Sequence, residues 1–391
     1  MNSRSNKETR AGHYIKQSGG FYAFIPNKLP PDPPIVIDED MWSLLSQADR
    51  ALGRLDGTTE TLPNPDLFVL MYVRKEAVLS SQIEGTQASL MDVLEYEAKA
   101  LRAGKAGDVE EVINYVSAMN YGLDRLKDLP VSLRLIREIH EKLLSGVRGG
   151  ERNAGQFRTS QNWIGSAGVP ISEASFVPPP PHEMASSLDN LEKFIHGKNP
   201  MPLFVKIGLT HAQFETIHPF LDGNGRVGRL LITFLLCERG ALKRPLLYLS
   251  HYFKGYRTDY YDRLQAIRDK GDWESWLKFF LRGVFEVSEE ATNTARDIVR
   301  LREEHRLMIT DKFGGAAGNA ITLLENLYWS PIISINHVAK VTNLAYANAN
   351  KLVGKFMQMN LLREITGRKR DRRFAYGPYL RLLSDDSNER L

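Results

Sequence analysis

The chain has 391 residues, of which 42% are hydrophobic and 25% charged, a composition typical of a soluble globular protein with two or three domains. Its 51 Lys and Arg residues nearly balance 47 Asp and Glu residues, so the net charge of +4 excludes coating of nucleic acid through overall charge. The single cysteine, Cys237, excludes an intrachain disulfide, and the lack of a signal peptide or long apolar run predicts a cytoplasmic protein without a membrane segment.

The N-terminal part, residues 1–37, is predicted to be an arm. Residues 1–12 are polar and typical of disorder, and the proline-rich stretch 26–37 indicates an extended segment. From Asp38 apolar residues recur at helical spacing, which predicts a helical extension over residues 38–130.

A mainly α core with a short β-hairpin flap is predicted over residues 131–312. The Gly-, Ser- and Pro-rich stretch 149–181 interrupts the helical pattern, and the flap at 156–181 is either a hairpin that clamps a ligand or a solvated connector. The helices of the extension and core are expected at about 38–56, 64–82, 87–102, 107–126, 131–146, 182–197, 201–217, 225–239, 256–269 and 273–310.

Residues 313–391 are predicted to form a winged helix-turn-helix domain. The glycine-rich stretch 313–319 is typical of a domain boundary, and three short helical segments follow it. The stretch LLREITGRKRDRRFAYGPYL then indicates two strands around a basic turn. Such a wing could contact DNA phosphates, or the domain could bind a target protein or join two chains as a homodimer, and the sequence leaves these alternatives open.

One stretch of the core, HPFLDGNGRVGR, combines a base, an acid, two arginines and a glycine-rich turn. Pro219 ends the preceding helix, and the glycines let backbone N–H groups approach a ligand closely. The free amides at the start of the next helix attract anions. Arg226 and Arg229 are three residues apart, so they share one helix face and suit phosphate oxygens.

The titratable groups of this stretch indicate group transfer. Asp222 offers a hard oxygen ligand for a magnesium ion that bridges phosphates, and His218 has an ordinary pKa near neutrality, so it can accept a hydroxyl proton. Together they predict transfer of a phosphate-bearing group from a nucleotide to a hydroxyl, whereas DGNG alone would be an ordinary turn. Phe220 is expected to anchor the loop in the core, and His211 to be a packed histidine because no third metal ligand accompanies it.

The order His-Pro-Phe-x-Asp-Gly-Asn-Gly-Arg-x-x-Arg resembles the signature of the Fic family of protein adenylyltransferases at every fixed position. The resemblance covers roughly residues 30–300 and implies AMPylation. In that reaction ATP binds with Mg²⁺ or Mn²⁺, and a Ser, Thr or Tyr hydroxyl of a target protein attacks the α-phosphate. AMP stays on the target and pyrophosphate leaves. Related Doc-type kinases carry lysine where Gly225 stands, so Gly225 favours AMP transfer.

The resemblance also implies roles for individual residues. His218 would be the base, Asp222 would bind the metal ion and Arg229 would bind the γ-phosphate. The nucleotide-binding residues of the motif would be Asp222, Gly223, Asn224, Gly225, Arg226, Val227, Gly228 and Arg229.

A second stretch, SSQIEGT at residues 80–86, resembles the inhibitory motif of the family through Ser80, Glu84 and Gly85. A glutamate near the nucleotide site would pair with Arg229 and place negative charge where the γ-phosphate must lie. Because the motif lies in the N-terminal extension, the resemblance implies inhibition in cis. The alternative is a solvated glutamate before a helix-ending glycine.

Further residues are candidates for contacts around the nucleotide. Ile164, Phe176 and Val177 lie in the flap and could border the nucleotide or hold a target segment by strand addition. Tyr260 and Tyr261 match a tyrosine pair on the family helix that closes the adenine pocket, with ordinary helix packing as the alternative.

Two other functions stay open at this point. The chain could be a DNA-binding regulator whose Fic core senses ATP. The same site could also remove AMP from a target, with Glu84 positioning a water molecule.

Overall fold

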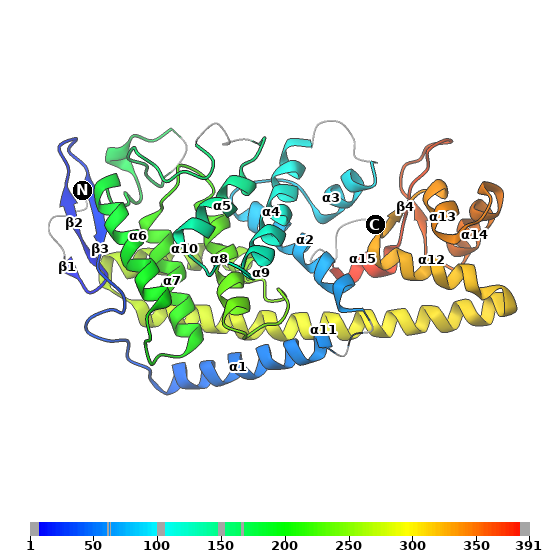
Figure 1. Cartoon of the computed structure of the whole chain (residues 1–391), viewed down its shortest axis with the longest axis horizontal. Coiled ribbons are helices and arrows are strands. Elements are labelled where there is room, and N and C mark those ends of the chain that lie inside the picture. Colours follow the sequence, from blue (N-terminus) through cyan, green and yellow to red (C-terminus); the bar gives the residue numbers. More distant parts are fainter. Residues whose placement is uncertain are drawn as a thin grey trace.

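The computed structural model describes residues 8–60, 62, 64–99, 106–147, 153–165 and 168–383. The molecule is mainly helical, as predicted. It is also elongated, and α11 runs along most of its length (Figure 1). The α-helices are α1 Glu39–Glu60, α2 Pro65–Ile83, α3 Leu90–Glu97, α4 Ala106–Arg125, α5 Leu133–Leu143, α6 Pro181–His196, α7 Leu203–Ile217, α8 Asn224–Glu238, α9 Ser250–Gly255, α10 Arg257–Lys270, α11 Trp273–Phe313, α12 Ala317–Trp329, α13 Ile335–Thr342, α14 Tyr346–Gln358 and α15 Gly377–Leu383. The strands are β1 Glu8–Thr9, β2 Gly12–Lys16, β3 Tyr22–Pro26, β4 Ile332–Ile333, β5 Arg363–Glu364 and β6 Phe374–Ala375, and short 3₁₀ helices lie at Ile171–Glu173 and Gly314–Ala316.

A three-stranded antiparallel sheet of β1, β2 and β3 lies at the N-terminal end of the molecule (Figure 1). The prediction of disorder over residues 1–12 is therefore wrong for residues 8–12, while residues 1–7 lie outside the described residues. Tyr14 and Phe24 pack edge to face with centroids 5.0 Å apart, and burial of these rings on the helical body stabilises the strands. The proline-rich segment 27–37 has neither helix nor strand, as predicted.

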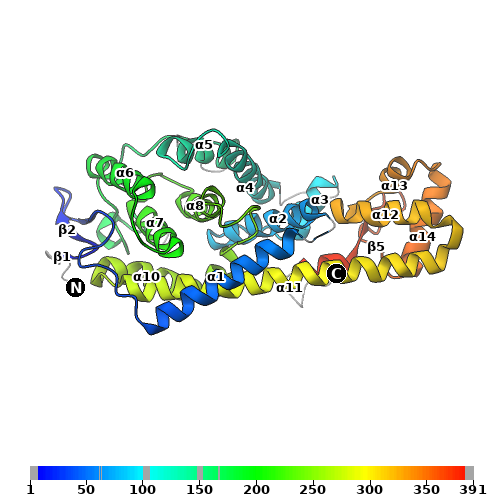
Figure 2. The same ribbon diagram turned by 60° about the horizontal axis from the view of Figure 1, so that its bottom comes forward.

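The candidate motif lies between two helices at the centre of the helical body. The apolar run of α8 is buried over nearly its whole length, which explains why α8 occupies the middle of the bundle formed with α4, α5 and α7 (Figure 2). A Cβ on Gly122 would lie 2.3 Å from the ring of Phe234, so glycine at this position lets α4 approach α8 closely. The loop before α8 is consequently held by several helices at once.

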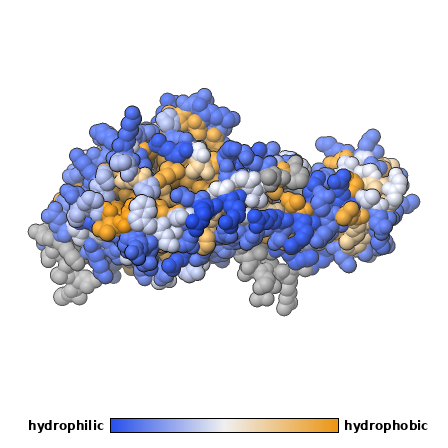
Figure 3. All heavy atoms as spheres, turned by 90° about the horizontal axis from the view of Figure 1, so that it is seen from below, coloured by the Kyte–Doolittle hydropathy of each residue, from blue (hydrophilic) through white to orange (hydrophobic). Residues whose placement is uncertain are grey.

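Two long helices border this body. α1 and α11 pack side by side (Figure 2), and α2 packs against α4, α8 and α9. Seen from below, this face is mostly hydrophilic, with hydrophobic residues in separate patches (Figure 3). No helix in the described part of the chain combines the length and apolar character that a membrane crossing needs.

The segment α3 is shorter than the helix predicted over 87–102. Ser89 accepts a hydrogen bond from the Asp92 amide at 3.1 Å, and the Asp92 carboxylate accepts one from the Ser89 amide at 2.9 Å. This capping box starts the helix three residues later than expected. Residues 100–105, at the end of the predicted helix, lie outside the described residues.

The predicted short β-hairpin flap is present only in reduced form among the described residues of this region. Within its described residues, a single antiparallel bridge joins Ile164 to Phe176. The run Pro178 to Pro181 has no backbone N–H groups to extend that pairing. The Phe24 amide donates to the Val177 carbonyl at 2.9 Å, so the N-terminal sheet holds this side of the flap instead.

The C-terminal unit contains the three predicted helices, α12, α13 and α14, and a sheet in the order β4-β6-β5. The two predicted strands are β5 and β6, while β4 and α15 were not anticipated. α11 is shared with this unit, because His305 bonds to the Tyr376 hydroxyl at 2.6 Å. The arrangement is compatible with a winged helix, and its identity as one stays a prediction.

Candidate active site

The loop between α7 and α8 is shaped by two residues in the left-handed backbone region. His218 ends α7 with φ of 49°, and Gly223 precedes α8 with φ of 75°. The Val227 amide donates the first hydrogen bond of α8, to the Gly223 carbonyl at 3.0 Å. The amides of residues 224–226 therefore precede the helical ladder and form the anion-attracting N-terminus that was predicted.

Asn224 braces this loop from within. Its side-chain oxygen accepts from the Phe220 amide, and its side-chain nitrogen donates to the Phe220 carbonyl, both at 2.8 Å. Asn224 is 3% exposed, and both polar atoms of its side chain are used within the loop, so the side chain holds the turn and does not contact a ligand. Phe220 is fully buried, which confirms its predicted role as the anchor of the loop.

His140 on α5 fixes the loop from the other side, and no motif in the sequence pointed to it. Its ring stacks on Phe220 with centroids 3.7 Å apart and an interplanar angle of 5°. The Gly155 amide donates to Nδ1 at 2.9 Å, so Nδ1 has no proton, and Nε2–H donates to the Asp222 carbonyl at 3.1 Å. Burial lowers the pKa of His140 to about 4, which keeps this neutral tautomer in place.

His218, the predicted base, is neutral in this setting. Burial, followed by the positive charges of Arg268 and Arg158, lowers its pKa to about 4. Its buried Nδ1 has no hydrogen-bond partner within the described residues. The His218 carbonyl accepts hydrogen bonds from Arg158 Nε at 3.0 Å and Asn162 Nδ2 at 3.3 Å, so residues of the flap region hold its backbone in place.

Arg229 is occupied by the stretch that resembles an inhibitory motif. Its Nη2 donates to Glu84 Oε1 at 2.7 Å and to the Ser80 carbonyl at 3.0 Å, while Nε donates to Ser80 Oγ at 2.8 Å. Burial is the largest single influence on Glu84 and opposes its ionisation, but the charge and hydrogen bond of Arg229, together with Arg226 and His218, hold the pKa of Glu84 below its ordinary value. Gly85, in the left-handed region with φ of 101°, ends the segment that presents this glutamate.

Gly225 is the residue over which Glu84 lies. An ideal Cβ at Gly225 would stand 2.2 Å from Glu84 Oε1, so any larger side chain would collide with the carboxylate. The Glu84 side chain remains 35% exposed, whereas that of Arg229 is 2% exposed. The carboxylate thus occupies the space directly above the start of α8, where the amides attract an anion.

Arg226 has a buried carboxylate partner on α4 that no motif in the sequence indicated. Glu111 on α4 lies 3.3 Å from Arg226 Nη1, and both side chains are almost fully buried. The Thr86 hydroxyl donates to the same Glu111 oxygen at 3.3 Å. Glu111 therefore joins an arginine of the motif to the residue two positions after Glu84.

We expect Glu111→Ala to lower the free energy of unfolding by about 3–5 kcal/mol, because the buried Arg226 would lose its buried carboxylate partner and keep only the more exposed Asp222 carboxylate, at 3.6 Å. Urea denaturation followed by circular dichroism measures this change. Glu110→Ala provides the matched control, since Glu110 is the neighbouring carboxylate and faces Tyr96 at 3.5 Å. Equal destabilisation by the two variants would contradict a special role for the buried ion pair.

Asp222 is the candidate metal ligand at the mouth of the loop. Its carboxylate accepts from the Gly223 amide at 2.7 Å, lies 3.6 Å from Arg226 Nη2 and is 33% exposed. Among the described residues, no group of three or more His, Cys, Asp or Glu side chains could hold a metal ion. One carboxylate beside an anion-binding turn fits Mg²⁺, which commonly takes one or two protein carboxylates together with phosphates and water.

Glu215, one turn before His218, is a buried carboxyl group behind the motif. Burial raises its pKa from the ordinary 4.5 to about 7, and its Oε1 has no partner among the described residues. A Cβ on Gly228 would lie 2.4 Å from this oxygen, so glycine is required there. Glu76 on α2 is comparable, since burial raises its pKa to about 7, and it accepts from the Tyr115 hydroxyl at 3.0 Å.

The raised pKa of Glu215 predicts a pH-dependent loss of stability. The folded state holds the proton up to about pH 7 and the unfolded state only up to about 4.5, so stability falls as the pH rises through this window. Because Glu215→Gln lacks this titration, the difference in free energy of unfolding between the variant and the parent protein should shift in favour of the variant as the pH rises through this window, and should stay constant above it. Unfolding curves at several pH values measure the difference between Glu215→Gln and the parent protein. Glu141→Gln, at an exposed glutamate, is the control. A Glu215→Gln profile that runs parallel to that of the parent protein would contradict the prediction.

The two candidate tyrosines separate in the structure. Tyr260 is buried, and its hydroxyl bonds to His211 Nε2 at 2.9 Å. The other His211 nitrogen bonds to the Gly228 carbonyl at 3.0 Å, which confirms that His211 is a packed histidine. Tyr261 is 40% exposed, and Arg257 lies over its ring at 5.5 Å. Only Tyr261 therefore presents a ring to solvent.

The remaining predicted residues are divided between the core and the surface. Phe176 and Val177 are buried, and the Arg268 guanidinium stacks on the Phe176 ring at 3.7 Å. Ile164 is half-buried and pairs with Phe176. Val227 is buried on the core side of α8. The groups that converge on the mouth of the loop are His218, Asp222, Gly223, Gly225, Arg226, Arg229 and Glu84.

Comparisons with known proteins match two family models to the region that contains this site. Residues 42–124 match the model of the Fic/DOC family N-terminal region, and residues 130–236 match that of the Fic/DOC family. A protein adenylyltransferase Fic of Aedes aegypti is 29% identical over 255 residues, covering 62% of this chain and 46% of the relative. A probable protein adenylyltransferase of Aquifex aeolicus is 32% identical over 181 residues, covering 45% of this chain and 51% of the relative.

Solved structures show the same fold. A Fic family protein from Desulfovibrio desulfuricans has a TM-score of 0.58 at 20% identity, over 88% of this chain and 97% of that one. Fic-1 from C. elegans has a TM-score of 0.50 at 20% identity, over 66% of this chain and 74% of that one.

The chain is a Fic/DOC family protein with distant homology to protein adenylyltransferases. It spans about half the length of the curated relatives it matches.

Proposed function

We propose that the protein is an adenylyltransferase that transfers AMP from ATP to Ser, Thr or Tyr hydroxyls of target proteins and of itself. The observation that carries the proposal is the convergence of a neutral His218, Asp222 and two arginines on the free N-terminus of α8. Together these groups offer a proton acceptor and an anion-binding turn, which AMP transfer requires.

In the proposed reaction, the hydroxyl oxygen of the target attacks the α-phosphorus of ATP. The new bond joins this oxygen to the α-phosphorus, the bond from the α-phosphorus to the bridging oxygen of the β-phosphate breaks, and pyrophosphate leaves. His218 accepts the hydroxyl proton. The amides of residues 224–226, with Arg226 and Arg229, bind and orient the phosphates. A Mg²⁺ or Mn²⁺ ion held by Asp222 would neutralise phosphate charge.

We further propose that Glu84 inhibits this reaction in cis. Its carboxylate occupies Arg229 and lies over Gly225, so it adds negative charge where the terminal phosphate would bind. Glu111 pairs with the other arginine, so each arginine of the motif has a carboxylate partner in this conformation. Release of Glu84 is the step that would free Arg229 for ATP.

The proposal is tested by incubating the purified protein with ATP labelled at the α-phosphate and magnesium. We expect covalent label on the protein and release of pyrophosphate. Transfer of label from γ-labelled ATP instead would indicate phosphoryl transfer and contradict the proposal. Contacts with DNA and formation of a homodimer stay separate predictions, to be tested by gel shift and by light scattering.

A second proposed activity at the same site is removal of AMP from modified proteins. The observation that favours it is the ionised, partly exposed Glu84 carboxylate above the phosphate-binding turn, where it could orient a water molecule. Loss of AMP from a labelled protein on addition of the parent enzyme, but not of Glu84→Gly, would support it.

A further inference from the structure

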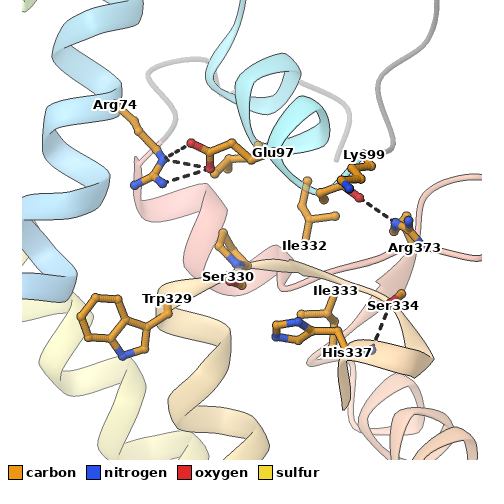
Figure 4. Close-up of a pocket in the computed structure, with 13 residues that line it drawn as sticks. Arg74, Glu97, Lys99, Trp329, Ser330, Ile332, Ile333, Ser334, His337 and Arg373 are labelled. Carbon is orange, nitrogen blue, oxygen red and sulfur yellow. Dashed lines mark hydrogen bonds and ion pairs between the residues drawn. The ribbon is translucent and has the colours of Figure 1, made fainter. Parts of the chain in front are cut away.

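A cavity of about 320 Å³ lies where the N-terminal extension meets the C-terminal unit (Figure 4). Its walls come from α2, the end of α3, the end of α12, β4, the start of α13 and the residue before β6. None of the motif residues lines it. Its size is near the lower end of the range of small-molecule sites, about 300–1,000 Å³.

Positive charge predominates on the walls of this cavity. Arg74, Lys99 and Arg373 line it, and Glu97 is the single carboxylate among the described residues that line it. Both Glu97 oxygens already accept from Arg74 Nε at 3.1 Å, and Arg74 Nη2 lies 3.0 Å from Oε2. Glu97 therefore neutralises Arg74 and is not available to the other two cations.

Lys99 and Arg373 lie close together on one side of the cavity (Figure 4). Arg373 Nε donates to the Ala98 carbonyl at 3.0 Å, which places its guanidinium beside the end of α3. Within the described residues, neither the Lys99 ammonium nor the terminal guanidinium nitrogens of Arg373 have a hydrogen-bond or ion-pair partner. Two such cations facing one cavity are suited to hold a carboxylate or phosphate group.

The other described residues that line the cavity offer apolar contacts and no further carboxylate. Ile332, Ile333 and Leu94 contribute aliphatic side chains, and Trp329 presents an indole ring that is 44% exposed. His337 bonds to Asn326 at 2.7 Å. A molecule that places an anionic group at Lys99 and Arg373 could therefore rest its body against apolar side chains.

We propose that this cavity is a binding site for a small anionic molecule whose carboxylate or phosphate group is held by Lys99 and Arg373. Such a molecule would connect the end of α3 to the C-terminal unit. α3 follows the segment that carries Glu84, and Arg74 lies on α2, the helix that carries Ser80. Occupancy of the cavity would thus act on the inhibitory segment, a consequence that rests on the proposed function.

The test is direct binding to the full-length protein without ATP. Tryptophan fluorescence and calorimetry are recorded while inorganic phosphate or succinate is added, and the two titrations distinguish a phosphate from a carboxylate ligand. We expect saturable binding of at least one of them, with a fluorescence change that is lost in Trp329→Phe. Affinity should fall at least tenfold in Lys99→Gln and in Arg373→Gln.

Arg370→Gln is the matched control, because Arg370 is an exposed arginine of the same basic segment that does not line the cavity. Absence of saturable binding of both anions would overturn the proposal, as would an equal loss of affinity in Arg370→Gln. Binding of duplex DNA that weakens equally in Arg370→Gln and Arg373→Gln, without anion binding, would assign these residues to nucleic acid and also overturn it.

A second readout addresses the inhibitory segment. In the parent protein, the anion that binds should change the rate of AMP incorporation at least twofold, and Arg373→Gln should abolish this response. Because binding is measured without nucleotide, failure of the cavity proposal can be distinguished from failure of the proposed AMP transfer. Anion binding with no change in rate would retain the site and overturn its effect on Glu84.

Discussion

Replacement of Glu84 by glycine is expected to raise AMP incorporation at least about tenfold. The hydrogen bond between Glu84 and Arg229 is charge-assisted, and such bonds contribute roughly 1.5–3 kcal/mol, which corresponds to about a tenfold or larger change in an equilibrium. Removal of the carboxylate frees Arg229 and clears the space above Gly225. Mass spectrometry of the protein after exposure to ATP and magnesium measures the added AMP.

Two variants make this experiment specific. Glu84→Gln keeps the size of the side chain and removes its charge, so we expect an intermediate rate. Glu39→Gln removes an exposed carboxylate at the start of α1 and should leave the rate unchanged. If Glu84→Gly and the parent protein incorporate AMP equally, the inhibitory role of Glu84 is wrong, even if the protein is an adenylyltransferase.

Replacement of His218 by alanine in the Glu84→Gly background is expected to reduce AMP incorporation by a factor of about 10²–10⁴, the usual contribution of a general base. ATP affinity should change much less, because the proposed phosphate contacts come from the start of α8 and from its two arginines. Labelling assays and calorimetric titration with ATP and magnesium measure the two quantities separately.

The control for this variant is His196→Ala, which removes an exposed histidine at the end of α6 and should leave both quantities unchanged. A His218→Ala protein that labels at the parent rate would remove His218 from the mechanism. Loss of ATP binding together with activity would instead indicate that His218 shapes the phosphate site. Circular dichroism confirms that each variant is folded before the rates are compared.

The position of Glu84 illustrates how much of the candidate site could be predicted from the sequence. Ser80, Glu84 and Arg229 were paired through their resemblance to two motifs, and the structure places them in direct contact. Glu111, His140 and Arg158 could not be found in this way, because each contacts the loop from a distant helix or segment. A buried histidine or glutamate on an amphipathic helix carries no local signal that separates it from ordinary packing.

In the flap and the N-terminal sheet, strand pairing could not be predicted from the sequence. The short β-like pieces around Ile164 and Phe176 were recognised, but their pairing is reduced to one bridge because prolines follow them. Residues 8–26 contain three strands, and the rings of Tyr14 and Phe24 on these strands are buried against the helical body. The polar composition of residues 1–12 had predicted disorder instead. Strand pairing depends on what lies beside the segment, so local composition predicts it poorly.

The sequence by itself determined the helical class of the protein, the turn between α7 and α8, and the chemistry of the groups on that turn. These properties follow from spacing, proline and glycine positions and side-chain type, which act within a few residues. Only the tertiary structure decided which carboxylates pair with Arg226 and Arg229, which nitrogen of His140 carries its proton, and which cations face the cavity beside α3. These properties depend on burial and on contacts between residues far apart in the chain, because desolvation and charge pairing are set by the assembled surroundings.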